Sequence, residues 1–210
     1  MPDITCCFTT YPPRAKNIPA VLDNMRKQTC APNRYIMTLA RQDEQLRDIV
    51  AGMRDVEVHI VEQDTGVWKK WLPVSELLAP NELILTIDDD LLFPTYAVEE
   101  LVNTLAENPQ RPVSGNHYWH NGLKCHCGAF SLVRPYYYKG WQQYYELWRS
   151  VKSSDMFYTM LAANNKHTYA QTRTDWPQVA EAYNDGVAYT RKGMVQASYE
   201  QIARVFGWIK

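Results

Sequence analysis

The sequence predicts an α/β fold with a mostly parallel central sheet between layers of helices. In residues 1–110, short runs of apolar and β-branched residues alternate with segments of helical periodicity, and such alternation produces parallel strands joined by right-handed crossovers. The run 83–87 (LILTI) is nearly all apolar, as expected of a central strand covered on both faces. Ligands of such sheets bind at the carboxyl ends of the strands, so the segments that follow them are the functional candidates.

The first half of the chain contains the more regular elements. Its predicted strands are 4–9, 34–39, 56–61 and 83–87. Apolar residues at the spacing of one helical face predict helices at 17–28, 46–53 and 97–106. Asn17 is the expected N-cap of the first of these. The segment 68–78 is also predicted to be helical, with a kink or break near Pro73.

The second half is less regular, and a smaller part with antiparallel or irregular structure is expected there. Strands are predicted at 113–118 and 129–133, and helices are predicted to begin at Ser154 and Ser198. No function is predicted from residues 170–210.

Composition and charge exclude several classes of protein. The formal net charge is −1, whereas a general nucleic-acid-binding protein carries a basic excess, so no nucleic-acid partner is expected. No run approaches ~18 uninterrupted apolar residues, so no transmembrane segment is expected. The five cysteines are an odd number, and the N-terminus has no signal-peptide pattern. Reduced thiols and a cytoplasmic location are therefore predicted, with Cys6 and Cys7 as buried core residues.

Three consecutive aspartates, Asp88, Asp89 and Asp90, follow the most apolar strand. Alternation along an extended chain would place Asp88 and Asp90 on one face and Asp89 on the other. Carboxylates that share a face, with no Lys or Arg near them in sequence, repel each other, and a hard divalent cation relieves this repulsion. The triplet therefore predicts a Mg²⁺ or Mn²⁺ site. The alternative is a solvated acidic turn; an EF-hand is excluded because its glycine and later glutamate are absent.

Four segments resemble the small, family-2-like members of the GT-A nucleotide-sugar glycosyltransferases, and they occur in the family's order. They are 8–14 (FTTYPPR), the D-x-G of Asp64 to Gly66 with Lys69 downstream, the D-x-D of Asp88 to Asp90 with Pro94, and 153–156 (SSDM) at the start of a later helix. The resemblance covers about residues 4–165. It implies a GT-A (Rossmann-like) fold for a single domain, 1–210, with a nucleotide-binding half at 1–110 and an acceptor-side half at 111–210.

The resemblance implies a role for each matching position. Asp88 and Asp90 would bind the metal, and Asp155 would be the base that deprotonates the acceptor hydroxyl. The family often has two acidic residues at that helix start, whereas Ser154 precedes Asp155 here; the alternative for Asp155 is a carboxylate that only stabilises the helix N-terminus. The nucleotide-binding residues would be Thr9, Tyr11, Arg14, Asp64, Lys69, Asp88 and Asp89.

The resemblance also implies a reaction. The enzyme would be a hexosyltransferase-like glycosyltransferase that moves a sugar from a nucleoside diphosphate, with UDP as the first choice, to a hydroxyl of a carbohydrate or glycolipid. The anomeric centre would be inverted, the cofactor would be Mn²⁺ or Mg²⁺, and peripheral contact with a membrane would be compatible with a glycolipid acceptor. The residues suit this chemistry, because a divalent cation stabilises charge on the leaving diphosphate and a carboxylate base accelerates proton removal.

Two other functions stay open. The same carboxylates would suit a metal-dependent nucleotidyltransferase or phosphotransferase. A non-catalytic zinc-binding module is the other, because His117, His120, Cys125 and Cys127 are suitable ligands, although their spacing fits no standard zinc finger.

Several further residues are secondary candidates for the site. His117 or His167 would supply an additional metal contact. Trp119 and Trp141 would be stacking platforms for a sugar, or they would fill the core. Lys69 and its neighbour Lys70 would face the nucleotide, or they would be solvated helix positions.

Overall fold

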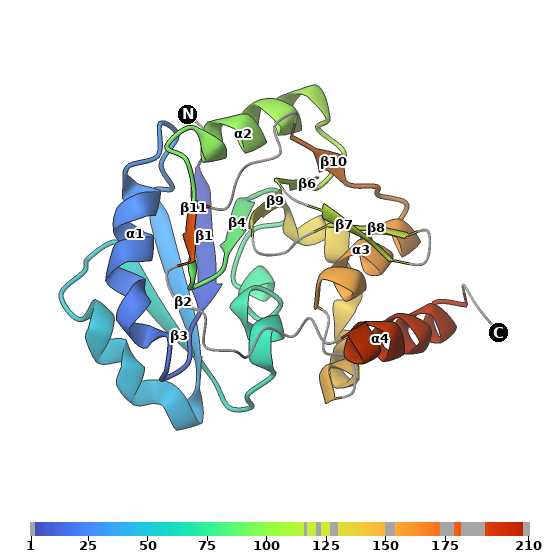
Figure 1. Cartoon of the computed structure of the whole chain (residues 1–210), viewed down its shortest axis with the longest axis horizontal. Helices are drawn as coiled ribbons and strands as arrows, with labels where there is room; N and C mark the ends of the chain where they lie inside the picture. The colour runs from blue at the N-terminus through green and yellow to red at the C-terminus, as the bar shows by residue number, and fades with distance from the viewer. Residues whose placement is uncertain are drawn as a thin grey trace.

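A computed structural model of the chain describes residues 3–115, 117–120, 123–126, 130–149, 154–172, 179–181 and 192–207. Its centre is a seven-stranded sheet in the order β10-β6-β9-β4-β1-β2-β3 (Figure 1). The strands of this sheet are β1 (Ile4–Thr9), β2 (Arg34–Ala40), β3 (Val56–Val61), β4 (Leu83–Ile87), β6 (Val113–Ser114), β9 (Phe130–Val133) and β10 (Ala170–Gln171). The predicted α/β class is confirmed.

The strands predicted from the first half of the chain all form, and they are parallel. β1 lies between β2 and β4, so that Cys6 is opposite both Tyr35 and Leu85, and β3 follows at the edge. β9 runs antiparallel to both β4 and β6. Because β1 to β4 point the same way, their carboxyl ends meet at one edge of the sheet.

The predicted strand at 113–118 is wrong in extent. β6 ends at Ser114, where the amide of Gly115 donates to the carbonyl of Phe130. The chain then begins a separate hairpin of β7 (His117–His120) and β8 (Leu123–His126). A second small ladder pairs β5 (Leu91–Leu92) with β11 (Val179–Glu181).

Four α-helices are described: α1 (Ile18–Arg26), α2 (Ala97–Glu107), α3 (Ser154–Asn164) and α4 (Lys192–Val205). The first three begin close to their predicted positions, whereas α4 begins before the predicted Ser198. None of the helices in the described part of the chain has the length and apolar character needed to cross a membrane.

Two predicted helices are 3₁₀ segments instead. The first is Arg41–Val50, where 46–53 was the prediction. The second prediction, 68–78, is divided into Gly66–Lys70 and Val74–Glu76, with Pro73 between them. Proline has no N–H and its ring clashes with the preceding turn, so an α-helix does not continue through it.

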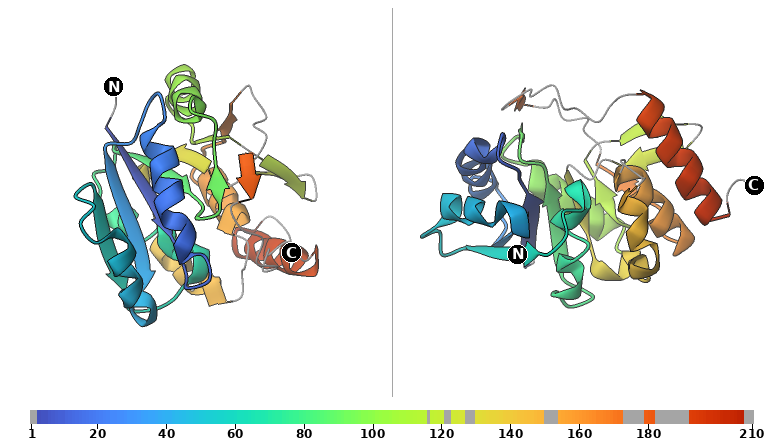
Figure 2. Two further views of the ribbon diagram at one scale, coloured as in Figure 1. Left: turned by 60° about the vertical axis from the view of Figure 1, so that its left-hand side comes forward. Right: turned by 90° about the horizontal axis from the view of Figure 1, so that it is seen from below.

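Both faces of the sheet are covered by apolar side chains. Cys6 and Phe8 of β1 belong to a buried cluster with α1 and α2, whereas Cys7 belongs to a second cluster with α3, α4 and the segment Gly66–Lys70. Figure 2 shows α1 and α4 on opposite sides of the molecule. Burial raises the pKa of the thiols of Cys6 and Cys7, so both are inert core residues, as predicted.

The aromatic segment at 136–148 contributes mainly to the second cluster. Tyr137 and Tyr138 are fully buried, and Trp141 is buried with them. The interpretation of Trp141 as a sugar platform is therefore wrong, because its ring is not available to a ligand. The side chain of Trp119 lies outside the described residues.

We expect the substitution Tyr35→Phe to leave the free energy of unfolding unchanged or to increase it by about 1 kcal/mol. Tyr35 lies in β2, and its buried hydroxyl has no hydrogen-bond partner within the described residues. A buried polar group without a partner destabilises the fold by about 1–3 kcal/mol. Chemical denaturation of both proteins measures the difference.

Tyr138→Phe is the matched control, because Tyr138 is equally buried and its hydroxyl is hydrogen-bonded to that of Tyr169. This variant is expected to lose about 1 kcal/mol. An equal loss in both variants would show that the Tyr35 hydroxyl does have a partner.

Candidate active site

The candidate active site lies at the edge where β1, β3 and β4 end. Arg14 follows β1, Asp64 follows β3, and the aspartate triplet follows β4 directly. The parallel register brings these segments together although they are far apart in sequence. This is the edge at which ligands bind on open α/β sheets.

Arg14 and Thr10 hold two of the three aspartates. The Thr10 hydroxyl donates to Asp89 Oδ2 at 2.7 Å. The Arg14 guanidinium lies 2.7 Å from Asp90 Oδ2 and 3.3 Å from Asp89 Oδ1, all through Nη1. The side chains of Asp89 and Asp90 are only 8% and 22% exposed, so the solvated-turn alternative is wrong.

The predicted division of the triplet between two faces is also wrong. Asp89 and Asp90 share one guanidinium nitrogen, and Asp88 is paired separately with Lys70. The cause is that β4 ends at Ile87, so strand alternation no longer applies to the three residues after it. The triplet has no Lys or Arg near it in sequence, but the fold brings Arg14 and Lys70 to it from other segments.

Burial and mutual repulsion alter the acidity of this cluster. Burial, followed by the charge of Asp88, raises the pKa of Asp90 to about 6, although Arg14 opposes this. Burial also raises the pKa of Asp89, against the hydrogen bond from Thr10. Asp90 is therefore ionised at neutral pH but takes up a proton in mildly acidic solution.

The D-x-G segment forms a tight turn after β3. The Gly66 amide donates to Asp64 Oδ1 at 2.9 Å, and Gly66 has a φ of 60°, a conformation that favours glycine. Lys69 also contacts Asp64 Oδ1, at 2.7 Å. Burial raises the pKa of Asp64, but the bonds from Lys69 and Gly66 outweigh this and lower the pKa below its usual value.

Lys69 and Lys70 are both buried, with side chains 4% and 3% exposed, so their interpretation as solvated helix positions is wrong. Lys70 Nζ lies 2.7 Å from Asp88 Oδ1. A buried ammonium needs a carboxylate or an equivalent acceptor, and these two neighbours each reach a different one. Sequence analysis missed Lys70 as a contact of the triplet, and the only signal was its position beside Lys69.

Thr9 and Tyr11 make contacts within the protein, and their nucleotide-binding roles stay predictions. The Thr9 hydroxyl donates to the carbonyl of Thr38 at 2.7 Å, and thus joins β1 to β2. The Tyr11 ring lies 5.5 Å from the Arg14 guanidinium carbon, within range of a cation–π contact that orients Arg14. Thr10, which was not predicted, is the threonine that contacts the aspartates.

Asp155 lies in the first turn of α3, as predicted. One turn later, the Tyr158 ring packs edge-on against Trp71 at 4.0 Å, and Trp71 directly follows Lys70. Burial raises the pKa of Tyr158, and the charges of Asp155 and Asp88 add to the effect. The start of α3 is therefore on the same side of the sheet as the segment that reaches the triplet.

Comparisons with known proteins decide the fold. No protein-family model and no curated protein matches the sequence. Solved structures do match. PcManGT, a mannosyltransferase from Pyrobaculum calidifontis in complex with GDP-Man and Mn²⁺, matches with a TM-score of 0.63 and 12% identity over 99% of this chain and 73% of that chain. S. aureus TarS in complex with UDP-GlcNAc matches with a TM-score of 0.57 and 12% identity over 98% of this chain. The fold is GT-A.

The GT-A fold of this chain is also similar to another class of enzyme. A 4-diphosphocytidyl-2C-methyl-D-erythritol synthase matches with a TM-score of 0.53 and 9% identity, over 93% of this chain and 100% of that chain. By contrast, this chain spans 59% and 66% of the length of two TarS chains that it matches. Similarity at these identities establishes the GT-A fold and not the reaction.

The residues at the GT-A strand edge fit a divalent cation that also binds a phosphate. Within the described part of the chain, no group of three or more His, Cys, Asp or Glu side chains forms a complete metal cage. Asp88 and Asp90 offer two carboxylates, and Mg²⁺ and Mn²⁺ in phosphate-binding sites are usually held by one or two carboxylates plus phosphate oxygens. The donor set therefore suits such a metal only together with a nucleotide.

The alternative metal ligands receive no support from the described side chains. His117, His120 and Cys125 belong to the β7–β8 hairpin, whose side chains lie outside the described part, and Cys127 lies outside it altogether. His167 follows the C-terminal end of α3, the end remote from Asp155. Its Nδ1 lies 3.0 Å from the Gln110 carbonyl. This contact leaves Nε2 available, so the metal contact of His167 stays a prediction.

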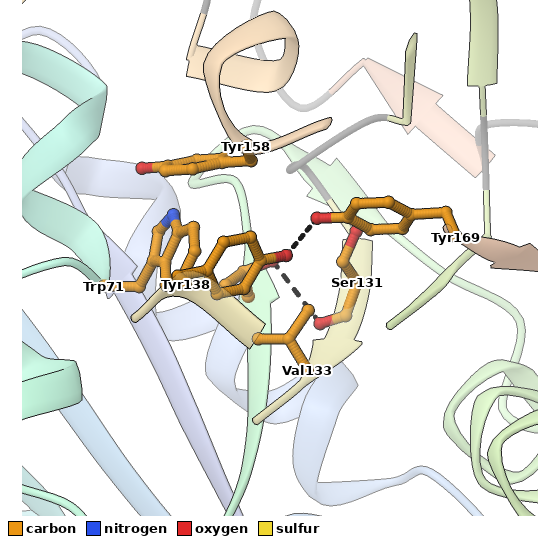
Figure 3. Close-up of a pocket in the computed structure, with 7 residues that line it drawn as sticks. Trp71, Ser131, Val133, Tyr138, Tyr158 and Tyr169 are labelled. Carbon is orange, nitrogen blue, oxygen red and sulfur yellow. Dashed lines mark hydrogen bonds between the residues drawn. The ribbon is translucent and has the colours of Figure 1, made fainter. Parts of the chain in front are cut away.

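Residues of β4 and β9 contribute to the lining of an aromatic pocket (Figure 3). Trp71 and Tyr158 line it together with Tyr138 and Tyr169, whose hydroxyls are hydrogen-bonded to each other. Thr86, Ser131 and Val133 complete the lining. This lining carries no charged group, and the candidate chemistry remains at the aspartates.

Proposed function

We propose that this protein is a metal-dependent glycosyltransferase that uses a nucleoside-diphosphate sugar. The observation that carries the proposal is the half-buried triplet at the carboxyl end of β4 in a GT-A fold, paired with cations that follow β1 and β3. The same edge holds Asp64 and Lys69 beside it. Similarity to structures that contain UDP-GlcNAc, or GDP-Man and Mn²⁺, supports the choice of donor class.

In this proposal, Asp88 and Asp90 hold Mn²⁺ or Mg²⁺. When bound, the metal stabilises the negative charge on the leaving diphosphate as a Lewis acid. Asp64 and Lys69, which are fixed against each other, face the nucleoside, and Arg14 provides a guanidinium for the diphosphate. Residues 1–110 then form the nucleotide-binding half and 111–210 the acceptor-side half of one domain.

The transfer proposed is a single displacement. A hydroxyl oxygen of a carbohydrate or glycolipid acceptor forms a bond to the anomeric carbon, and the bond from that carbon to the diphosphate oxygen breaks. Asp155 takes the hydroxyl proton, and the nucleoside diphosphate leaves with the bonding electron pair. Attack opposite to the leaving group inverts the anomeric centre. UDP is the first choice for the nucleotide and a hexose for the sugar.

Titration of the protein with UDP and GDP, with and without Mn²⁺, tests the proposal. We expect at least one nucleotide to bind at micromolar to millimolar concentration with Mn²⁺, and at least tenfold more weakly when EDTA removes the metal. Isothermal calorimetry measures both affinities. Binding that does not respond to the metal would contradict the proposal.

A nucleotidyltransferase is the second candidate, because the synthase structure is covered over its full length by this chain. The two reactions release different products. A nucleotidyltransferase releases pyrophosphate from a nucleoside triphosphate, whereas the proposed transferase releases a nucleoside diphosphate from a nucleotide sugar. Phosphorus NMR of the reaction mixture distinguishes them.

We also propose that the protein acts in the cytoplasm. Cys6, Cys7 and Cys30 are buried, and all three are free thiols. Such thiols are typical of a reducing compartment. Contact with a membrane surface would follow only if the acceptor were a glycolipid.

A further inference from the structure

Arg14 contacts the carboxylate of Asp90 that the proposed metal would also use. Its Nη1 lies 2.7 Å from Asp90 Oδ2 and 3.3 Å from Asp89 Oδ1. These are the distances of a charge-assisted hydrogen bond and of a close ion pair. The guanidinium therefore serves as a counterion of Asp90.

A metal ion and Arg14 would compete for this carboxylate. A divalent ion bound to Asp90 Oδ2 at about 2.1 Å would lie next to a guanidinium that contacts the same oxygen. Two positive centres a few ångströms apart in a site that is mostly shielded from water repel each other strongly. Entry of the metal would therefore weaken the contact between Arg14 and Asp90.

The backbone of Arg14 is held in place, and its side chain is more exposed than that of Lys70. The Arg14 amide donates to the Tyr11 carbonyl at 3.0 Å, so the turn after β1 is held in place. The guanidinium lies over the Tyr11 ring, and its side chain is 16% exposed, against 3% for Lys70. Arg14 is thus at the rim of the cluster, and Lys70 is enclosed beneath it.

We propose that Arg14 is exchanged between two anions, Asp90 in the resting enzyme and the donor diphosphate once a divalent cation has replaced it. This inference rests on the proposed function and assigns an order to it: metal entry releases the residue that then binds the diphosphate. A guanidinium suits both partners, because it forms paired hydrogen bonds with carboxylates and with phosphates alike. Arg14 consequently opposes metal binding alone and favours donor binding.

The test measures Mn²⁺ affinity without nucleotide, by electron paramagnetic resonance of free Mn²⁺. We expect Arg14→Gln to bind Mn²⁺ at least tenfold more tightly than the wild type, because the competing cation is gone. Arg14→Lys keeps a competing cation and should stay within about threefold of the wild type. With saturating Mn²⁺, calorimetry should show that Arg14→Gln binds UDP or GDP at least tenfold more weakly.

Arg26→Gln is the matched control. Arg26 also pairs with an aspartate, Asp55, at 2.8 Å, and it also lies over a tyrosine ring, that of Tyr35 at 5.7 Å, but it is outside the site. Neither affinity should change in this variant. A change equal to that of Arg14→Gln would mean that lost charge anywhere on the protein explains the result, and would overturn the inference.

The failure of this inference differs from the failure of the proposed function. If the wild type binds UDP or GDP only with Mn²⁺, but Arg14→Gln binds Mn²⁺ no more tightly than the wild type, the exchange is wrong and the function stands. If no nucleotide binding depends on Mn²⁺, both are wrong.

A measurement on the wild type covers the case in which Arg14→Gln does not fold. In protein labelled with ¹⁵N-arginine, Mg²⁺ without nucleotide should shift the side-chain resonance of Arg14, identified by its loss in Arg14→Lys. The resonance of Arg26 should stay in place. An Arg14 resonance that does not respond to saturating Mg²⁺ would overturn the exchange.

Discussion

Replacement of Asp155 by asparagine is expected to lower the turnover number for sugar transfer by about 10²–10⁴-fold and to leave donor affinity near that of the wild type. Asp155 lies in the first turn of α3, where the helix dipole stabilises a negative charge. An amide keeps the shape of the side chain but cannot accept the acceptor's proton. Steady-state kinetics with a nucleotide sugar and calorimetry with UDP or GDP separate the two effects.

Glu99→Gln is the matched control for this substitution. Glu99 is a carboxylate in the first turn of α2, and it accepts a hydrogen bond from Thr29, so it has the structural role without the proposed chemical one. This variant should retain full turnover. Equal losses in the two variants, or full turnover in Asp155→Asn, would reduce Asp155 to a helix-start carboxylate.

The sheet could be predicted from the sequence because its strands have a local signal. The run LILTI is apolar at every position but Thr86, and β4 is buried along its whole length. Continuous apolar runs between helical patterns specify a parallel sheet without reference to the rest of the chain. The edge that carries the site followed from the same pattern.

The pairing of charges at the site could not be predicted, because it depends on contacts between segments far apart in sequence. Arg14 reaches Asp89 and Asp90 only because β1 and β4 are neighbours, and Lys70 reaches Asp88 across 18 positions. The end of β1 at Thr9 was predicted correctly, but the Thr9 hydroxyl bonds to β2, and Thr10, the next residue, contacts Asp89.

The segments predicted to be helical at 46–53 and 68–78 form 3₁₀ helices with shifted bounds, and the predicted break near Pro73 is confirmed. Apolar spacing does not readily distinguish an α-helix from a short 3₁₀ segment, because both place residues i and i+3 on one side. In the second segment this difference hid the position of Lys70. The 3₁₀ turn of Gly66–Lys70 buries both lysines, where an exposed α-helical face was the alternative.

Replacement of Asp90 by asparagine is expected to abolish metal-dependent nucleotide binding, a loss of at least 100-fold in affinity with Mn²⁺. The substitution removes one of the two carboxylates proposed to hold the cation, and an amide oxygen is a much weaker ligand for a hard divalent ion.

In the wild type, Mn²⁺ affinity should be constant above about pH 7 and fall about tenfold for each pH unit well below 6, because the proton on Asp90, whose pKa is about 6, competes with the metal. Asp90→Asn should show no such pH dependence.

The same variant is expected to be more stable than the wild type in the absence of metal. The pKa of Asp90 is about 6 in the folded protein and near 3.8 in the unfolded chain, so the folded state binds this proton more tightly. The free energy of unfolding therefore decreases as the pH rises from about 4 to about 6, and asparagine, which mimics the protonated acid, avoids that decrease. At pH 7 the gain should be on the order of 1–3 kcal/mol, and at pH 3 it should disappear.

Asp55→Asn provides the opposite case. The hydrogen bond from Arg26 lowers the pKa of Asp55, so the ionised carboxylate of Asp55 stabilises the fold. Loss of this carboxylate should decrease the free energy of unfolding at pH 7. Binding of Mn²⁺ and of the nucleotide should be unchanged. Urea denaturation with and without Mn²⁺ plus UDP or GDP reads both effects, because a bound ligand stabilises the folded state. The wild type and Asp55→Asn should gain stability from the ligands and Asp90→Asn should not. If Asp90→Asn were instead less stable than the wild type at pH 7, the triplet would be a structural ion-pair network, and not a site held under repulsion for a cation.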